Sequence, residues 1–355
     1  MKIRKNKKSN MAQRTAIIIV TYNGSTWITG CLASVFRSDA DSFDVCVVDN
    51  HSSDDTLQKV SDEFPQVTVI PLTENRGFCG GNNIGIQRAL DEGYERVVLL
   101  NQDTEVTPGW LSALIKASHD HAVGVVQSLL LMGDNPSLIN SSGNVLQYLG
   151  FGYVGDLRRP LQSYHETEVH DIGYASGAAV LYTREVLLTV GLFDESYFAY
   201  HEDLDISWRA RIAGYRVVVA PESKVLHYYS FQRNKNLLYW SERNRLMTIL
   251  KNYQLGTLLI LLPVGILIEC MMLAYSLLSG FIHKKIWSYF FILFHIPSIM
   301  RSRARIRRFR TQSDRLVMRH MAVRLDFSEM CNPLIRYVVN PMLEFYYAAS
   351  KHFIR

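Results

Sequence analysis

The stretch RVVLLNQDTEVTP, Arg96–Pro108, decides the fold of this chain. Its apolar run, Val97–Leu100, has the length and composition of a buried strand and stops abruptly at Asn101-Gln102-Asp103. A carboxylate therefore stands at the tip of a central strand. From its position alone, Asp103 is either a turn or helix N-cap residue or an oxygen ligand for a hard cation such as Mg²⁺ or Mn²⁺.

Further apolar, β-branched segments lie on both sides of this stretch, with helically spaced segments between them. The predicted strands are Ala16–Thr21, Phe43–Asp49, Val67–Pro71, Arg96–Leu100 and Ala122–Val126, and the predicted helices are Trp27–Phe36, Thr56–Phe64, Asn83–Glu92 and Trp110–Ser118. This alternation predicts an α/β fold with a mostly parallel, Rossmann-like sheet flanked by helices. Ligands of such sheets bind at the carboxyl ends of the strands, where Thr21-Tyr22-Asn23, Asp49-Asn50 and Asn101-Gln102-Asp103 stand.

The composition and the absence of certain motifs disfavour several classes of protein. With 48% hydrophobic and 20% charged residues among 355, the chain has the composition of a globular protein. The first strand ends in VTYNG, and neither GxGxxG nor GxxxxGK[ST] occurs, which disfavours nicotinamide dehydrogenases and P-loop enzymes. A haloacid-dehalogenase phosphatase needs a nucleophilic aspartate where Asn101 stands, and an amide is a poor nucleophile. The five cysteines have no metal-binding spacing and suit a reducing cytosol.

Three more segments carry candidate chemistry. ENRGFCGGNNIG, Glu74–Gly85, is either a tight connection or a glycine-rich loop whose amides meet an anion. Phe193–Tyr215 places five acids before or within a predicted helix, where Glu202 and Asp203 either complement the helix dipole or supply a general base. His227 follows a predicted strand and is either structural or part of a metal site.

Together these segments resemble the inverting family 2 glycosyltransferases with the GT-A fold. The motifs that carry the resemblance, in order, are IIIVTYNG, VVDNHSSDDT, ENRGFCGGNNIG, LLNQDTEV, ASGAAVLYTREV, FDESYFAYHEDLDISWR and VLH. The similarity covers roughly residues 15–229, and YWSERNRL extends it. The most similar subgroup is the rhamnosyltransferase-like enzymes that build O-antigens and other cell-surface polysaccharides.

The resemblance implies a role for each motif. Asp203 matches the catalytic base, Asp103 the last carboxylate of the family's DxD motif, and His227 a histidine that completes the metal site. Asn101 departs from the first aspartate of that motif, which puts its direct ligation of metal in doubt. The implied nucleotide-sugar-binding residues are Thr21, Tyr22, Asn23, Asp49, Asn50, Arg76, Gly77, Gly81, Asn83, Asn101 and Gln102. The implied donor and acceptor loop consists of Ser176, Gly177 and Ala178, together with Glu202.

The resemblance also implies a reaction. A sugar would pass from a nucleotide-sugar, with dTDP-rhamnose the leading donor, to a saccharide acceptor that is lipid-linked, with Mg²⁺ or Mn²⁺ on the diphosphate. Other donors stay open, namely a UDP-hexose, a UDP-hexosamine or UDP-galactofuranose, as does an inactive nucleotide-binding scaffold. The QxxRW motif of processive synthases is absent, which favours addition of one or a few sugars.

The C-terminal third predicts contact with a membrane. After a basic tail (1–14) and a catalytic domain (15–235), region 236–310 contains the apolar runs Leu255–Ile282 and Ile286–Met300 and then six arginines in Arg301–Arg310. The first run would extend roughly 42 Å as a helix, enough to cross a bilayer. Lys284-Lys285 between the runs favours a re-entrant or interfacial pair at the cytoplasmic face of the inner membrane over a spanning hairpin.

Two alternatives to that membrane contact remain. A buried core helix would be unusual at this length, and the position of the arginines beside an apolar run favours lipid headgroups over nucleic acid as their partner. Residues 311–355 read as a mixed helical segment broken at Asn332-Pro333 and Asn340-Pro341. No function is predicted for this last segment.

Overall fold

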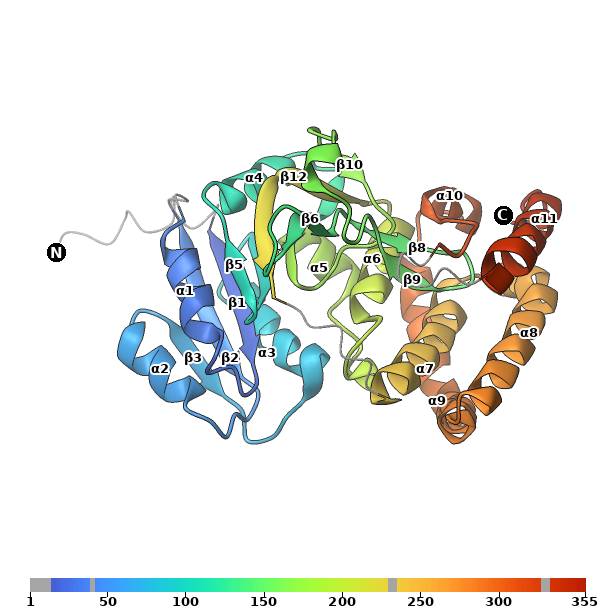
Figure 1. The fold of residues 1–355 in the computed structure, drawn as a ribbon, viewed down its shortest axis with the longest axis horizontal. Coiled ribbons are helices and arrows are strands. Elements are labelled where there is room, and N and C mark those ends of the chain that lie inside the picture. Colours follow the sequence, from blue (N-terminus) through green and yellow to red (C-terminus); the bar gives the residue numbers. More distant parts are fainter. Residues whose placement is uncertain (1–13, 39–41, 229–234, 327–332) are drawn as a thin grey trace.

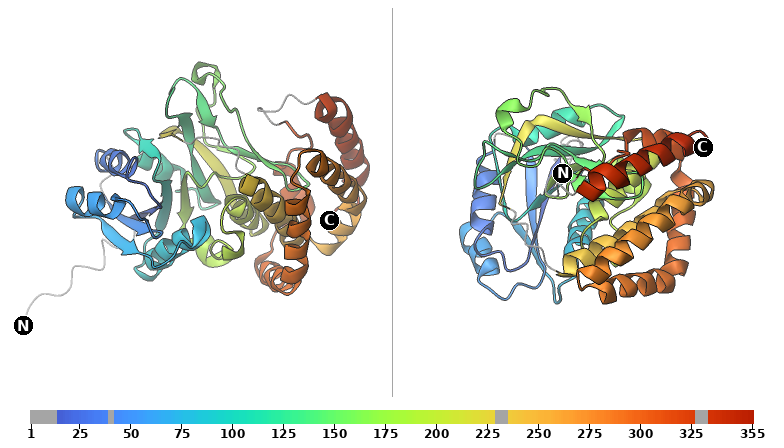
Figure 2. Two further views of the ribbon diagram at one scale, coloured as in Figure 1. Left: turned by 60° about the horizontal axis from the view of Figure 1, so that its bottom comes forward. Right: turned by 45° about the vertical axis from the view of Figure 1, so that its right-hand side comes forward.

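The computed structural model describes residues 14–38, 42–228, 235–326 and 333–355. All but the last residue of the predicted basic tail therefore lies outside the described ranges. Within them, helices cover both faces of one central sheet, and a second, wholly helical region lies at one end of the molecule (Figures 1 and 2). The predicted α/β fold, with its mostly parallel sheet, is confirmed.

The central sheet has the strand order β10-β12-β6-β11-β4-β1-β2-β3. Its strands, with β5 and β7 paired at its side, are β1 (Thr15–Thr21), β2 (Phe43–Asp49), β3 (Thr68–Pro71), β4 (Arg96–Asn101), β5 (Thr104–Val106), β6 (Val123–Met132), β7 (Ile139–Ser141), β10 (His170–Asp171), β11 (Ala179–Thr183) and β12 (Arg216–His227). Strands β3, β2, β1 and β4 run parallel, β11 is antiparallel to both of its neighbours, and β6 and β12 are again parallel. Strand order reverses at β1, where α/β sheets open a crevice for ligands.

Two apolar layers fix the helices to the sheet. The helices are α1 (Ile28–Phe36), α2 (Thr56–Glu63), α3 (Gly77–Asp91), α4 (Trp110–Ala117), α5 (Arg184–Val190), α6 (Glu202–Ile212), α7 (Lys235–Asn252), α8 (Leu255–Leu278), α9 (Ile282–Phe309), α10 (Asp314–Val317) and α11 (Asn340–Ser350). Alternate residues of β1 point to opposite faces: Ile18 packs with α3, α5 and α6, and Ile17 with α1, α2 and α4. A third cluster joins α6 to α8, α9 and α11.

The remaining elements are short. A separate hairpin consists of β8 (Asn144–Leu146) and β9 (Gly152–Val154). Single turns of 3₁₀ helix are η1 (Leu161–Ser163), η2 (Glu195–Tyr197) and η3 (Met318–His320), and η4 (Ile335–Val339) is a π-helical turn. Between residues 127 and 169 the chain forms loops and short strands, and β6 continues to Met132, beyond its predicted end at Val126.

The glycine-rich segment differs from the prediction. Helix α3 begins at Gly77, not at Asn83, so most of the predicted loop is helix. Two of its glycines let the helix lie close on β1, because a Cβ on Gly81 would lie 2.8 Å from Val20 and one on Gly85 would lie 2.4 Å from Ile18. Close packing of helix on strand therefore accounts for these glycines, as in the alternative of a tight connection.

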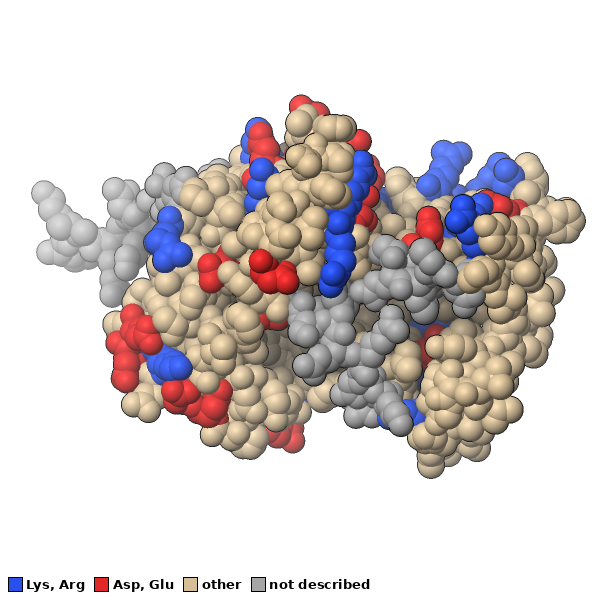
Figure 3. Space-filling model, viewed as in Figure 1, with Lys and Arg blue, Asp and Glu red and all other residues tan. Residues whose placement is uncertain are grey.

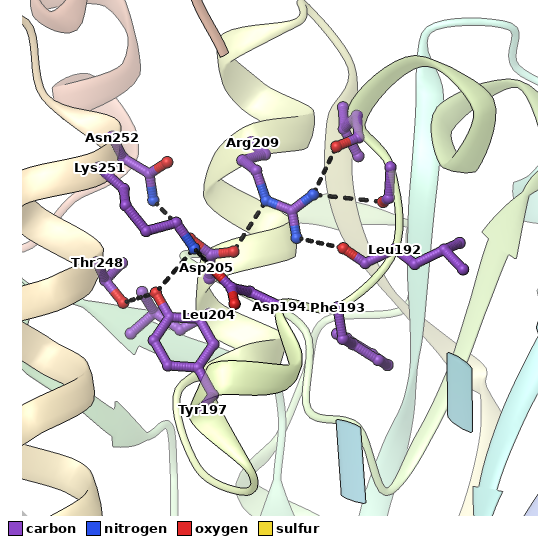
Figure 4. A network of polar contacts seen from close by, with 12 residues as sticks. Leu192, Phe193, Asp194, Tyr197, Leu204, Asp205, Arg209, Thr248, Lys251 and Asn252 are labelled. Carbon is purple, nitrogen blue, oxygen red and sulfur yellow. Dashed lines mark hydrogen bonds and ion pairs between the residues drawn. The ribbon is translucent and has the colours of Figure 1, made fainter. Parts of the chain in front are cut away.

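A buried carboxylate joins α6 to α7 (Figure 4). Asp205 has no exposed surface; Arg209 Nε donates to it at 2.9 Å, Asn252 Nδ2 at 3.0 Å, and Lys251 Nζ lies 3.3 Å away. Lys251 also pairs with Asp194 at 2.7 Å. Burial alone would raise the pKa of Asp205, but the two cations hold it below its usual value. The network fixes the start of α6 relative to α7.

Replacing this carboxylate tests how much the network stabilises the fold. We expect Asp205→Asn to lower the free energy of unfolding by about 3–5 kcal/mol, because it leaves buried cations without their counter-charge. Chemical denaturation followed by circular dichroism measures the change. The matched control is Glu222→Gln, which breaks an exposed pair with Lys116 and should change stability by less than about 1 kcal/mol. Equal effects for both variants would contradict this role for Asp205.

Candidate functional site

The carboxyl ends of β1 and β2 present a buried acceptor. Asp49 is 1% exposed, and its Oδ2 accepts a hydrogen bond from the Ser52 amide at 3.0 Å. Its Oδ1 is buried and has no hydrogen-bond partner among the described residues. Next to it, Asn23 accepts a hydrogen bond from the Ser53 amide at 2.8 Å and so ties the two strand ends together. A buried oxygen of this kind calls for a donor from a ligand or water.

The tips of β1 and β4 are also tied together. Thr21 Oγ1 donates to Gln102 Oε1 at 2.5 Å, and the Tyr22 amide donates to the same oxygen at 3.1 Å. The Tyr22 ring is about half exposed. The backbone of Asn101 donates to Ala178 O at 2.9 Å, which extends this edge to β11.

Other predicted nucleotide-binding residues shape the start of α3. The Asn50 side chain accepts from the Arg76 amide at 2.8 Å and donates to Gly77 O at 3.0 Å. Arg76 pairs with Glu195 at 3.0 Å on the surface. Asn83 is buried and donates to Phe193 O at 2.9 Å. In the structure Asn83 and Gly81 therefore serve packing, and nucleotide contact by either stays a prediction.

Asp103 and His227 lie together at the same edge. The Asp103 carboxylate follows β4, His227 ends β12, and the distance between Asp103 Oδ1 and His227 Nε2 is 3.7 Å. The Asp103 backbone carbonyl also accepts from the Tyr228 amide at 2.9 Å. Among the described residues no group of three or more Asp, Glu, His or Cys side chains is arranged to hold a metal ion. The described residues thus offer a carboxylate and an imidazole at this edge.

Asn140, on β7, sets the orientation of that imidazole. Its Oδ1 lies 3.1 Å from His227 Nδ1, while its Nδ2 faces Met132 Sδ at 3.4 Å. An amide oxygen only accepts, so the proton of a neutral His227 sits on Nδ1 and the lone pair of Nε2 faces Asp103. Burial lowers the pKa of His227, although the Asp103 charge opposes this, and the ring is neutral at pH 7.

One backbone segment connects this edge to the predicted base. Ala178 O accepts from Asn101, and the Gly177 amide donates to Asp203 Oδ2 at 3.3 Å. A Cβ at Gly177 would lie 2.9 Å from the Phe78 ring and 3.9 Å from Asp203 Cβ, so any larger residue there would displace Phe78. The Ser176 amide is held by the buried side chain of Gln127 at 2.7 Å. The predicted donor and acceptor loop thus lies between Asn101 and Asp203.

Two adjacent carboxyls begin α6 and do not ionise alike. Asp203 receives hydrogen bonds from the Leu204 amide at 2.8 Å and from Gly177, and retains some accessible surface. Glu202 is 6% exposed, and its Oε2 has no partner among the described residues. Burial raises the pKa of Asp203, and burial together with the Asp203 charge raises that of Glu202 much further. Of the two, Glu202 is therefore the carboxyl that keeps its proton to the higher pH, and Asp203 is the one that ionises first.

Helix α7 holds the turn that precedes these carboxyls. Phe198, Tyr200 and His201 all have left-handed backbone conformations, with φ of 64°, 67° and 69°. Such conformations are unfavourable for residues other than glycine. The buried side chain of Asn244 donates to three carbonyls of this turn at 2.7–3.2 Å, and Arg243 donates to two at 2.9 Å. These contacts fix the backbone immediately before Asp203.

Sequence reasoning missed Asn140 and the role of Asn244. Asn140 lies in a segment with poor periodicity, where nothing marks a single asparagine. Asn244 lies in YWSERNRL, the segment that extends the family resemblance, but the sequence alone does not indicate that its side chain binds the turn before α6.

Comparison with known proteins identifies the sheet domain. Residues 16–190, from β1 to the end of α5, match the family described as glycosyl transferase family 2. The chain carries a family 2 glycosyltransferase domain. The predicted resemblance, and with it the prediction of a glycosyltransferase, is confirmed. Asp203 and His227 lie beyond the matched range, so their roles stay predictions.

Relatives of this glycosyltransferase are named as enzymes of glycan synthesis. The N-acetylglucosaminyl-diphospho-decaprenol L-rhamnosyltransferase of Mycobacterium tuberculosis is 27% identical over 60% of this chain and 75% of its own length. The low-salt glycan biosynthesis hexosyltransferase Agl10 of Haloferax volcanii is 25% identical over 58% and 64%. The crystal structure of GalNAc-T7 with UDP, GalNAc and Mn²⁺ has a TM-score of 0.53 at 19% identity and covers 64% of this chain. This chain covers about half (48%) of GalNAc-T7, and that likeness shows the fold alone.

The contact between Asn140 and His227 gives a prediction for the metal-free protein. We expect ¹⁵N NMR of the histidine-labelled chain, with His227→Gln for assignment, to show the His227 proton on Nδ1. In Asn140→Ala the acceptor is gone, and we expect the proton to redistribute towards Nε2. The matched control is Asn135→Ala, an exposed asparagine before β7, which should leave the tautomer unchanged. A proton on Nε2 in the wild-type chain would show that Asn140 does not set the tautomer.

Proposed function

We propose that this glycosyltransferase transfers a single sugar, with inversion, from a nucleotide-sugar to a lipid-linked saccharide in cell-surface polysaccharide synthesis. Its leading donor is dTDP-rhamnose. The donor and acceptor classes are supported by the mycobacterial relative, which is named as an L-rhamnosyltransferase acting on N-acetylglucosaminyl-diphospho-decaprenol. The reaction type is supported by two carboxylates, Asp103 after β4 and Asp203 at the start of α6.

The observation that carries the proposal is the chain of contacts through Gly177 and Ala178. It connects Asn101, two residues before Asp103, with Asp203. On one side a carboxylate and an imidazole are available to a cation and its diphosphate. On the other a carboxylate is available to an acceptor hydroxyl. A transferase that inverts its sugar needs both, one at the leaving group and one at the nucleophile.

The residues present fit a divalent metal ion. Asp103 supplies an oxygen and His227 the Nε2 lone pair, a mixed set that Mn²⁺ accepts, while Mg²⁺ prefers oxygen ligands. When bound, the ion would supply Lewis-acid stabilisation of the leaving diphosphate. Asn140 keeps the imidazole in the tautomer that can coordinate. With two protein ligands, the diphosphate oxygens of the donor would complete the site.

The base is prepared by its surroundings. A raised pKa brings Asp203 closer to neutrality, where a general base is most effective, while it is still ionised at pH 7. The amides of Gly177 and Leu204 orient its two oxygens. The neighbouring Glu202 has its pKa raised further, by burial and by the Asp203 charge, so it ionises after Asp203. Asp203 would accept the proton of the acceptor hydroxyl as that oxygen attacks the anomeric carbon.

Release of nucleoside diphosphate tests the reaction and the two carboxyls together. The full chain in detergent is incubated with Mn²⁺, each nucleotide-sugar in turn, and N-acetylglucosaminyl-diphospho-polyprenol. We expect release with one donor, its loss in Asp103→Ala, and a fall in kcat of at least about 100-fold in Asp203→Asn. The matched variant Glu202→Gln keeps a neutral side chain and should stay within a few fold of wild type.

The raised pKa of Asp203 predicts the direction in which kcat changes with pH. A base with a raised pKa works above that pKa and is lost as pH falls through it, so the acid limb of kcat should lie above about 4, the ordinary aspartate value. If Glu202→Gln were inactive and Asp203→Asn active, the roles of the two carboxyls would be reversed. If no donor were bound or cleaved with metal present, the transferase proposal would be wrong.

We further propose that α8 and α9 lie on the cytoplasmic leaflet of the membrane. Among the described residues α8 is the one helix long and apolar enough to cross a bilayer, with only 22% of its most apolar window buried, which is weak support by itself. Large exposed apolar side chains cover both helices: Leu255, Leu259, Leu262, Ile266, Leu267, Tyr275, Leu277 and Leu278 on α8, and Ile286, Trp287, Phe290, Leu293, Phe294, Ile296 and Met300 on α9. Figure 3 shows a broad uncharged surface at that end of the molecule.

Buried charges hold the turn between α8 and α9 against the catalytic side. Lys285 is 2% exposed, and its Nζ lies 2.6 Å from Glu242 of α7 and 2.8 Å from Glu269 of α8. Arg245 pairs with both acids. Glu269 therefore faces α7, not lipid. Because α7 also holds the turn before Asp203, a bilayer cannot separate the α8–α9 turn from the catalytic site, which supports an interfacial pair over a spanning hairpin.

The arginines of the cluster fall into two groups: some bind the end of α7, and the others are exposed. Arg303 donates to backbone carbonyls of Leu250 and Tyr253, and Arg310 donates to that of Asn252, so both cap the end of α7. Four others, Arg301, Arg305, Arg307 and Arg308, are exposed on α9 beyond the apolar face. That placement suits anionic headgroups at the edge of an apolar surface.

A single cysteine tests the topology. In a variant of the full chain lacking Cys270 and Cys331, we expect His283→Cys, on the exposed start of α9, to resist a membrane-impermeant maleimide in intact cells and to react after permeabilisation. Glu222→Cys, on the catalytic domain, is the matched control and should behave in the same way. Reaction of the α9 cysteine in intact cells, with the control unreactive, would establish a spanning hairpin.

A further inference from the structure

We propose that α11, with the π-helical turn before it, is a second lipid-contacting element that lies in the plane of the same membrane leaflet. This inference rests on the membrane placement proposed for α8 and α9 and assigns a task to the C-terminal segment. Its occupant is the anionic inner-leaflet surface. The observations that carry it are an exposed apolar stripe, the fixed opposite face and the surrounding charge.

The stripe follows helical spacing along the outside of the segment. Val338 and Phe345 are 55% and 78% exposed, and Pro341 and Ala349 are exposed at the positions that complete the same face. Phe353, just beyond the helix, is 72% exposed. Residues at intervals of three and four share one side of a helix, so these side chains form a continuous apolar surface. Exposed apolar surfaces of this extent mark interaction sites.

The opposite face of α11 packs against the rest of the protein. Leu343 is fully buried in the cluster that includes Leu261, Val264 and Ile268 of α8. Tyr346 donates to the carbonyl of Ile260 on α8. In both Figures 1 and 2, α11 lies beside α8 at the helical end of the molecule. The helix is therefore held against α8, with its apolar stripe turned outwards.

A second set of bonds fixes the start of the helix. The Asn340 side chain accepts from the Leu325 amide at 2.8 Å and donates to its carbonyl at 2.9 Å. Leu343 O accepts from Tyr148 at 3.2 Å. With its inner face occupied in this way, α11 cannot turn the stripe inwards without breaking these contacts.

The charged residues around the stripe favour an anionic membrane over a second protein as its partner. Arg336, Lys351 and Arg355 are exposed around the stripe, whereas Glu344, the acid within α11, is paired with Arg324 at 2.9 Å. Figure 3 shows Lys and Arg side chains gathered over α10 and α11, next to the uncharged surface of α8. An apolar stripe bordered by cations is the pattern of helices that lie in a membrane interface.

Partition of the full chain into vesicles tests the inference. Purified protein is sedimented with vesicles of phosphatidylethanolamine and phosphatidylglycerol. We expect Val338→Asp/Phe345→Asp to weaken partition at least about tenfold, because it places charges in the apolar stripe. The matched control is Leu188→Asp, at an equally exposed leucine on α5, which should partition like wild type. Thermal unfolding and donor hydrolysis in detergent establish that each variant is folded.

The outcomes separate the two membrane proposals. Leu262→Asp/Ile266→Asp, on the exposed face of α8, reports on the α8–α9 surface. If that variant lost partition and the α11 variant did not, the inference on α11 would be wrong and the α8–α9 placement would stand. If the wild-type chain did not sediment with vesicles, the membrane proposals for α8–α9 and for α11 would both be wrong. A change of oligomeric mass in the α11 variant, with unchanged partition, would assign the stripe to a second copy and overturn the inference.

Discussion

The arrangement of this enzyme depends on Asp205, a carboxylate with no exposed surface that is balanced by Arg209 and Lys251. The two cations come from different helices, so the charge balance is complete only when α6 and α7 are packed together. Desolvating an unpaired aspartate is costly, and this gives the packing a single favoured geometry. Asp203, two residues earlier on α6, takes its position from that geometry.

Helix α7 meets three parts of the molecule with three faces. One contacts Asp205, a second presents Arg243 and Asn244 to the turn before α6, and a third presents Glu242 and Arg245 to α8 and α9. The catalytic residues and the apolar helices are therefore attached to the same element. In the membrane placement proposed above for α8 and α9, α7 would connect the lipid surface with the candidate active site.

Much of the sheet domain could be read from the sequence because its signals are local. Apolar runs that end in polar clusters predicted the strands and placed Asp49 and Asp103 at one edge, whereas the link between His227 and Asp103 was implied only by the family resemblance. The sequence left two alternatives open for the glycines of α3, because a glycine in an anion-binding loop and one that permits close packing look alike until its neighbour, here Ile18 or Val20, is known. Asn140 could not be predicted for the same reason. Its role depends on its contact with His227, which lies 87 residues away in sequence.

Three non-glycine residues within four positions, Phe198, Tyr200 and His201, have left-handed backbone, and this gives the site a property of its own. At about 1–2 kcal/mol each, these conformations would relax in an isolated loop. They persist because Asn244, from a helix that follows the sheet domain in sequence, binds the carbonyls between them. A boundary at residue 235 therefore divides the sequence but not the catalytic unit. A C-terminal segment without the asparagine of α7 would therefore leave Asp203, the predicted base, after a turn of different shape.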